Sequence, residues 1–169
     1  SANFLNGFES GDPRKELTVN TGDQQIFKLL GAKNGNFKGN DNSPVNRIYM
    51  RYADVLLWKA EALIKDGQIP AGIAIINRIR QRARAGNNSV LADRSTSVDA
   101  NQAMSWLQQE RRVELGFESH RLSDLKRWKI AKQTLIAMGK PFADKHQLYP
   151  IPQAEVDKTV GKITQNPDY

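Results

Sequence analysis

The sequence predicts a mainly α fold of helical hairpins, with long irregular loops at its start and an extended C-terminal tail. First, apolar residues recur every three or four positions between Arg51 and Met138, which is typical of amphipathic helices. Second, residues 1–46 are rich in Gly, Asn and Asp, which favour turns. Third, residues 148–152 contain two prolines, each of which disfavours helix at the preceding position.

The chain of 169 residues suits one structural domain. We expect a loop-rich segment at 1–46, a helical-repeat scaffold of two helix pairs at 47–140, and an extended strap at 141–169. Within the first segment, residues 17–19 and 25–30 are short apolar pieces that suit brief strands or turns.

The first predicted helix begins near Arg51 and ends at Asp66 and Gly67, because glycine suits the left-handed cap that follows a helix. The second begins at Pro70, whose missing N–H costs little in a first turn. The short turn between them predicts an antiparallel hairpin. Small residues are expected to let the two helices approach closely: Ala60, Ala62, Ala71 and Ala74.

The third predicted helix covers residues 98–117, with Asp99 or Ser97 as its N-cap. Gly116 and Ser119 mark a bend. A fourth helix is expected over residues 122–138, ending before Gly139. The result is a second helix pair, and stacked helix pairs are how solenoid proteins bury their cores. In the tail, residues 153–157 suit one helical turn.

Composition excludes several kinds of site. The chain has no cysteine, so disulfides, thiolate metal sites and cysteine nucleophiles are ruled out. The two histidines, His120 and His146, lie outside any metal-ligand pattern, so no metal is expected. The sequence contains no phosphate-binding glycine loop and no nucleophile motif, so we expect no cofactor, no catalytic residues and no enzyme activity.

No apolar run approaches the roughly 20 residues that a membrane helix needs. The composition therefore suits either a cytosolic protein or one whose targeting segment has been removed.

The formal net charge of +7 raises the question of nucleic-acid binding, through a basic segment over residues 78–84. On a helix, Arg78 and Arg82 fall on one flank of the apolar stripe, while Arg80 and Arg84 fall on the other. We therefore expect a solvated helix surface and no nucleic-acid partner.

Residues 110–128 interleave charges with large apolar groups at helical spacing. Glu110, Glu114 and Glu118 could form a carboxylate row for acid–base chemistry, but nearby arginines would pair with them and lower their pKa values. We therefore predict a structural ion-pair network that holds the third and fourth helices together. Its members are Arg111, Glu114, Glu118, Arg121 and Asp124.

These motifs together resemble a known family. The residues that carry the resemblance are Gly-Asp-Pro-Arg at 11–14, Arg-Tyr-Ala-Asp-Val-Leu-Leu at 51–57, Ala-Glu-Ala at 60–62, Asn-Arg-Ile-Arg at 77–80, the run 110–128, Tyr-Pro-Ile-Pro at 149–152 and Gln-Asn-Pro at 165–167. In this order and spacing they resemble the C-terminal region of the SusD/RagB family, the surface lipoproteins that Bacteroidetes use to capture glycans or other nutrients.

The resemblance implies a fold of tetratricopeptide-like helix pairs and a noncatalytic protein that binds an oligosaccharide or another nutrient. It also implies a TonB-dependent outer-membrane transporter as partner in polysaccharide uptake. The full-length protein is then expected at the cell outer membrane, facing the surface and held by a lipid anchor that this chain lacks. The chain is accordingly expected to be a fragment of a longer protein.

Glycan sites combine an aromatic face with planar amides and carboxylates. The candidate ligand-binding residues are Asn36, Phe37, Asn40, Asp41 and Trp58. Ordinary turns share the chemistry of the first four, and Trp58 also suits packing against the neighbouring helix pair. Trp106 and Trp128 are expected in the core.

The alternative function is a helical-repeat scaffold for protein–protein interaction, with a partner held in a concave groove in which Trp58 is exposed.

Overall fold

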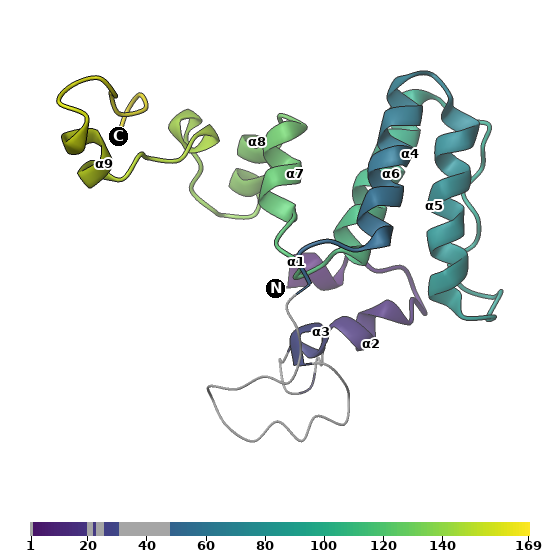
Figure 1. Cartoon of the computed structure of the whole chain (residues 1–169). Helices are drawn as coiled ribbons and strands as arrows, with labels where there is room; N and C mark the ends of the chain where they lie inside the picture. Colours follow the sequence, from purple (N-terminus) through teal and green to yellow (C-terminus); the bar gives the residue numbers. More distant parts are fainter. Residues whose placement is uncertain (1, 20–21, 23–25, 31–47) are drawn as a thin grey trace. The chain divides into compact units, whose positions relative to one another are not determined.

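In the computed structural model, the described residues are 2–19, 22, 26–30 and 48–169. They form helices joined by turns, with no β-strand among them, so the prediction of a mainly α fold is confirmed (Figure 1). Within these residues no helix is long and apolar enough to cross a membrane. The chain divides into two compact units, Ser1–Arg121 and Leu122–Tyr169. The segment boundaries expected at residues 46 and 140 stay predictions.

An antiparallel hairpin of α4 (Tyr52–Lys65) and α5 (Ile69–Arg84) forms the centre of the first unit (Figure 1). The turn between them is closed as predicted by Gly67, which has a φ of 80°. The N–H of Gln68 donates to the carbonyl of Leu63, and the N–H of Gly67 donates to that of Ile64. This is the pair of bonds that ends a helix at a left-handed residue.

The two helices are in close contact at Ala60 and Gly72. A Cβ added to Gly72 would lie 2.5 Å from Cγ1 of Ile64 and 2.9 Å from the carbonyl oxygen of Ala60. The other small residues expected in this contact, Ala62, Ala71 and Ala74, are exposed. The missing side chain of Gly72, a residue outside the set predicted for this contact, therefore allows the close approach of the helices.

Helix α6 (Ala100–Glu114) packs on both helices of the hairpin. Asp99 is its N-cap, since Oδ1 of Asp99 accepts a hydrogen bond of 2.8 Å from the N–H of Gln102. The core that the three helices share contains Leu57, Ala60, Ile64, Ile73, Ile76, Ile79, Ala103, Leu107 and Leu115. Trp106 packs on this core partly buried, rather than within it as expected.

Three short helices precede the hairpin: α1 (Ala2–Leu5), α2 (Arg14–Thr18) and α3 (Phe27–Leu30). Residues 17–18 and 27–30, from the two segments expected as brief strands or turns, thus belong to single helical turns, and residue 25 lies outside the described residues. Phe4 of α1 packs edge-on against Phe117 in the turn after α6, with ring centroids 5.1 Å apart. The N-terminal segment is therefore tied to the end of α6.

The predicted fourth helix over residues 122–138 is wrong, because it is two helices, α7 (Arg121–Arg127) and α8 (Ala131–Ala137). Lys129 breaks it with a φ of 60°. The N–H of Lys129 donates to the carbonyl of Lys126, and that of Ile130 to the carbonyl of Leu125. This is the same terminating pair of bonds that Gly67 makes after α4, formed here without the glycine that signals it in a sequence.

The second unit has a small core of its own, made by Leu125, Ala131 and Phe142. Trp128, also expected in the core, is partly buried and packs against the guanidinium of Arg127. A short 3-10 helix, η1 (Asp144–Gln147), precedes an extended stretch to Pro152, and α9 (Gln153–Lys158) follows where a helical turn was predicted.

Gly72→Ala is expected to destabilise the hairpin, although alanine favours helix over glycine by about 1 kcal/mol. The new methyl group has no room beside Ile64, and overpacking of this kind costs about 1–3 kcal/mol. Thermal unfolding followed by circular dichroism measures the change. Ala74→Leu is the matched control, because this exposed position on the same helix accepts a larger side chain. A Gly72→Ala protein as stable as the wild type would contradict the close contact.

Candidate functional site

A row of three buried carboxylates runs along α6 and into the turn that follows it. Glu110 and Glu114 lie one helical turn apart, and Glu118 comes four residues later. The exposed fractions of these residues are 3%, 2% and 8%. Buried charges cost several kcal/mol unless they are paired, so this row needs basic partners from elsewhere in the fold.

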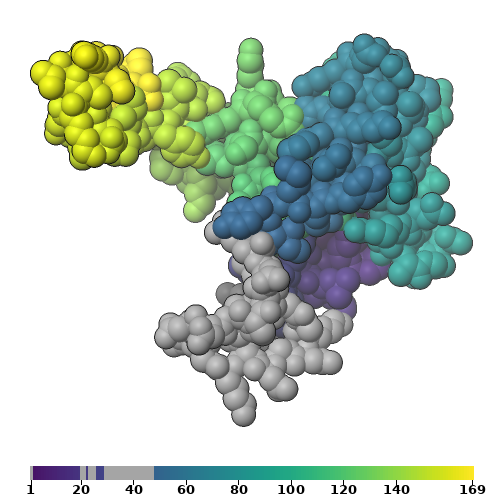
Figure 2. Space-filling view, viewed as in Figure 1, coloured from purple at the N-terminus to yellow at the C-terminus, as the bar shows by residue number. Residues whose placement is uncertain are grey.

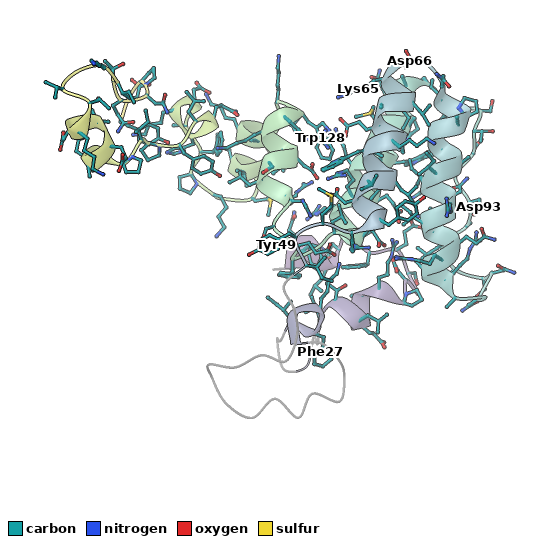
Figure 3. The ribbon with its side chains drawn as sticks, viewed as in Figure 1. Phe27, Tyr49, Lys65, Asp66, Asp93 and Trp128 are labelled. Carbon is teal, nitrogen blue, oxygen red and sulfur yellow. The ribbon has the colours of Figure 1, made fainter. Side chains whose placement is uncertain are left out.

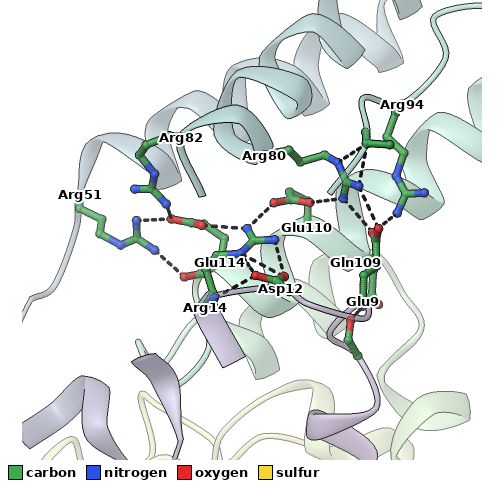
Figure 4. Close-up of polar contacts among 12 residues, drawn as sticks. Glu9, Asp12, Arg14, Arg51, Arg80, Arg82, Arg94, Gln109, Glu110 and Glu114 are labelled. Atoms are coloured by element: carbon green, nitrogen blue, oxygen red, sulfur yellow. Dashed lines mark hydrogen bonds and ion pairs between the residues drawn. The ribbon is translucent and has the colours of Figure 1, made fainter. Parts of the chain in front are cut away.

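The first partner is Arg14 at the start of α2. Its guanidinium lies 2.5 Å from Glu110 and 3.0 Å from Glu114 (Figure 4). Asp12 holds this side chain from the other side, with Nη2 of Arg14 2.8 Å from Oδ2. Asp12 also accepts from the backbone N–H of Arg14, so the turn at residues 11–14 aims the guanidinium at α6.

The second partner is Arg51, directly before α4. Its Nη1 lies 2.6 Å from Oε1 of Glu114, and its Nε lies 2.7 Å from Oε2 of Glu118. Lys28 of α3 completes the pairing of Glu118 at 2.5 Å. Arg51 thus connects the start of the hairpin with the end of α6.

Helix α5 contributes the third set of partners. Nη1 of Arg80 lies 2.8 Å from Glu9 and 3.4 Å from Glu110, and its side chain is 1% exposed. Arg82 reaches Glu114 at 2.6 Å. The expectation that residues 78–84 form a solvated surface is therefore wrong for Arg80. It is also incomplete for Arg82 and Arg84, which pair with Glu114 and Asp93. These pairings interrupt the basic strip on which the nucleic-acid hypothesis depended.

The pKa values of the row follow from these contacts. Burial alone would raise the pKa of Glu114, but the charges of Arg51, Arg82 and Arg14 lower it to about 2. The pKa of Glu118 is lowered in the same way against its burial, by Arg51 and Lys28. Burial prevails at Glu110, whose pKa is raised despite Arg14 and Arg80. The expectation of lowered pKa values is therefore wrong for Glu110.

The predicted ion-pair residues do not all meet. Arg51 joins Glu114 and Glu118. Arg111 instead pairs with the buried Asp54 of α4 at 2.9 Å. Asp124 pairs with Arg127, at 2.9 Å, in the second unit. The partners that the prediction missed are Glu9, Asp12, Arg14, Lys28, Arg51, Asp54, Arg80, Arg82, Arg94, Glu110 and Arg127.

Arg14 and Arg51 had a signal in the sequence, since both stand in motifs that carry the family resemblance. Their pairing with α6 spans 96 residues in one case and 63 in the other. Helical spacing reports only neighbours on one helix, so it could not show these contacts.

Two clefts adjoin the ion-pair row and share Arg51 and Arg82. One of about 280 Å³ lies toward α2 and α3. The other, of about 390 Å³, lies between the first turns of α4 and the second half of α5. We call the latter the arginine cleft, and its lining residues are Arg51, Tyr52, Ala53, Leu56, Arg78, Ile79 and Arg82.

A run of exposed apolar residues leads into α4 and continues along it. The blue segment before α4 lies on the face seen in Figure 2, and Tyr49 is labelled in Figure 3. Tyr49 is 76% exposed and Trp58, one of the predicted ligand contacts, is 43% exposed rather than packed away. We call this the apolar ridge, and its members are Ile48, Tyr49, Met50, Tyr52, Val55 and Trp58.

The other predicted ligand contacts, Asn36, Phe37, Asn40 and Asp41, lie outside the described residues. Among the residues that are described, no three His, Cys, Asp or Glu side chains are grouped to hold a metal ion. His120 lies 3.8 Å from Asp54, and Nδ1 of His146 accepts a hydrogen bond from the N–H of Ala143.

Comparison with known proteins identifies the relatives of this chain. The family model described as "SusD family" matches residues 8–169. The SusD-like protein P2 of Formosa agariphila is 34% identical in an alignment of length 155 that covers 86% of this chain and 30% of that protein. The chain therefore spans less than a third of this relative's length.

Solved structures show the same relationship. A SusD homolog from Bacteroides thetaiotaomicron aligns with a TM-score of 0.67 and 31% identity, over 85% of this chain and 31% of that one. The surface glycan-binding protein A of the same species aligns with a TM-score of 0.72 over the whole of this chain and 41% of its own. At 20% identity, this second match shows a shared fold alone.

The free energy of unfolding is expected to fall as the pH is lowered from about 4.5 to about 2. In this range Glu114 binds a proton when unfolded but not when folded, so acid favours unfolding. The raised pKa of Glu110 acts in the opposite sense, above pH 4.5. Urea unfolding at a series of pH values measures the slope, and Glu114→Gln should flatten its acid part. Glu155→Gln, at an exposed pair with Lys158, should leave the slope unchanged. An unchanged slope in Glu114→Gln would contradict this assignment.

Proposed function

Because the chain belongs to the SusD family, we propose that it is part of a noncatalytic protein that binds glycans or similar nutrients. Its partner would be a TonB-dependent transporter, and its place the outer-membrane surface, where the full-length protein is lipid-anchored. The observation that carries the proposal is the group of exposed aromatic side chains on and directly before α4, of which Tyr52 also lines the arginine cleft.

Exposed aromatic rings suit sugars because the C–H face of a sugar packs on the ring while its hydroxyls bond to polar groups around it. Tyr49, Tyr52 and Trp58 are 76%, 63% and 43% exposed. Large exposed apolar patches often mark binding sites, and these three rings lie within ten residues of one another in the sequence. Tyr52, Val55 and Trp58 of the ridge stand on α4, which is held by the hairpin contact and, through Arg51, by the ion-pair row. A rigid frame lowers the entropy lost on binding.

The carboxylates support a binding role over a catalytic one. A general acid near neutral pH needs a pKa close to that pH, whereas the pKa of Glu114 is about 2. The pKa of Glu110 is raised, but both of its oxygens face guanidinium groups, of Arg14 and Arg80. These groups are arranged to hold helices together.

The second candidate is a scaffold for protein–protein interaction. The apolar ridge favours it, because Ile48, Met50 and Val55 add aliphatic surface that sugars do not need. A partner segment with its own apolar face would then cover the ridge.

Titration calorimetry with a panel of oligosaccharides tests the proposal. We expect binding by the wild type and a loss of about tenfold in affinity for Tyr52→Ala, which corresponds to about 1.4 kcal/mol of lost contact. Tyr149→Ala is the matched control, since this tyrosine is 69% exposed but belongs to the second unit. Failure of every oligosaccharide to bind, with the protein folded, would refute glycan binding by this chain. Equal loss in both variants would refute the placement of the site.

A further inference from the structure

Arg78 differs from the other arginines of α5. The other three pair with carboxylates: Arg80 with Glu9, Arg82 with Glu114 and Arg84 with Asp93. Within the part of the chain that the structure describes, Arg78 has no carboxylate partner. Its guanidinium instead lies over the ring of Tyr52, 5.7 Å from the centroid. Such stacking holds the guanidinium in place and leaves its N–H donors available.

The arginine cleft combines an apolar wall with positive charge. Ala53, Leu56 and Ile79 give it an apolar wall. All of its charged lining residues are arginines, and among the described residues no Asp or Glu lines it. Its volume of about 390 Å³ lies within the range of small-ligand sites, roughly 300–1,000 Å³. A ligand with both an apolar face and a negative charge matches these walls.

The ion-pair cluster behind the arginine cleft does not cancel the positive charge of the cleft. In the ion-pair cluster around the α6 carboxylates, six basic side chains meet five acidic ones within the described residues, so the positive charge of Arg78 adds to an existing excess. The basic members are Arg14, Lys28, Arg51, Arg80, Arg82 and Arg94, and the acidic ones are Glu9, Asp12, Glu110, Glu114 and Glu118.

Two of the lining arginines are already ordered. Arg51 and Arg82 are held by Glu114, which is 2% exposed, so a ligand need not order them. Their positive field strengthens the attraction of an anion toward Arg78. Among the described residues, the site is thus one guanidinium without a carboxylate partner and two guanidiniums beside it that Glu114 holds.

From this arrangement we propose that the arginine cleft binds an acidic sugar, one whose ring carries a carboxylate or a sulfate group. The oxyanion accepts two parallel hydrogen bonds from the guanidinium of Arg78, a geometry that both groups fit. The C–H face of the sugar lies on Tyr52 and on the apolar wall of Leu56 and Ile79. This inference rests on the proposed glycan-binding function and narrows it to acidic glycans.

The test compares three oligosaccharides of the same length and linkage: neutral, uronate-bearing and sulfated. We expect the uronate or the sulfated form to bind at least tenfold more tightly than the neutral one at 50 mM salt. Which of the two binds more tightly distinguishes carboxylate from sulfate. The preference should shrink as salt rises, since part of it is long-range attraction.

Two variants locate the effect. Arg78→Gln should abolish the preference for acidic sugars, and melting curves should show an unchanged fold because Arg78 is exposed. Lys59→Gln makes the same charge change at an exposed position on α4 outside the cleft, and should keep the preference.

Each contrary result has a distinct meaning. Equal affinity for neutral and acidic sugars, or an unaltered preference in Arg78→Gln, would overturn this inference while leaving the proposed function intact. Inorganic sulfate binding as tightly as the sulfated sugar would overturn the role of the sugar ring. Binding of none of the three sugars would overturn both the inference and the proposed function.

Discussion

The need to neutralise the buried carboxylates of α6 and of the turn after it determines how the first unit is assembled. Glu110, Glu114 and Glu118 lie in an interior that tolerates charge only in pairs. Their partners come from α2, from α3, from the residue before α4, and from α5. The apolar core holds α4, α5 and α6 together, but it leaves α2 and α3 unfixed. The ion pairs connect those segments to α6, and so they specify one arrangement.

The cleft and the apolar ridge both depend on this arrangement. Arg51 is a member of the ion-pair row and a lining residue of both clefts. Its backbone also begins α4, where its carbonyl accepts from the N–H of Asp54. The side chains that face solvent at Tyr52, Val55 and Trp58 are therefore positioned by charges buried behind them. The ion-pair row and the proposed binding surface share residues, so this surface is more rigid than a free loop would be.

Much of the fold was predictable because its signals are local. Gly67 and Asp99 mark helix ends through their own backbone and side-chain chemistry, and both act as predicted. Lys129 takes the left-handed conformation without such a signal, so the split between α7 and α8 was missed. The site was less predictable, because it consists of contacts between residues far apart in the chain. Arg80 shows the difference: its helical position is local, whereas its burial against Glu9 is not.

The long sequence separation between Arg14 and its partners on α6 has a consequence for how the protein folds. Its guanidinium bonds to Asp12 two residues away and also to Glu110 and Glu114, which follow it by 96 and 100 residues. The α4–α5 hairpin forms from near neighbours, but the segment before it has no lasting place until α6 has been added. Closing a loop of about a hundred residues is an entropic cost that only completed pairing offsets. Within the described residues, the segment before the hairpin therefore depends for its pairing on a helix that follows it by about a hundred residues.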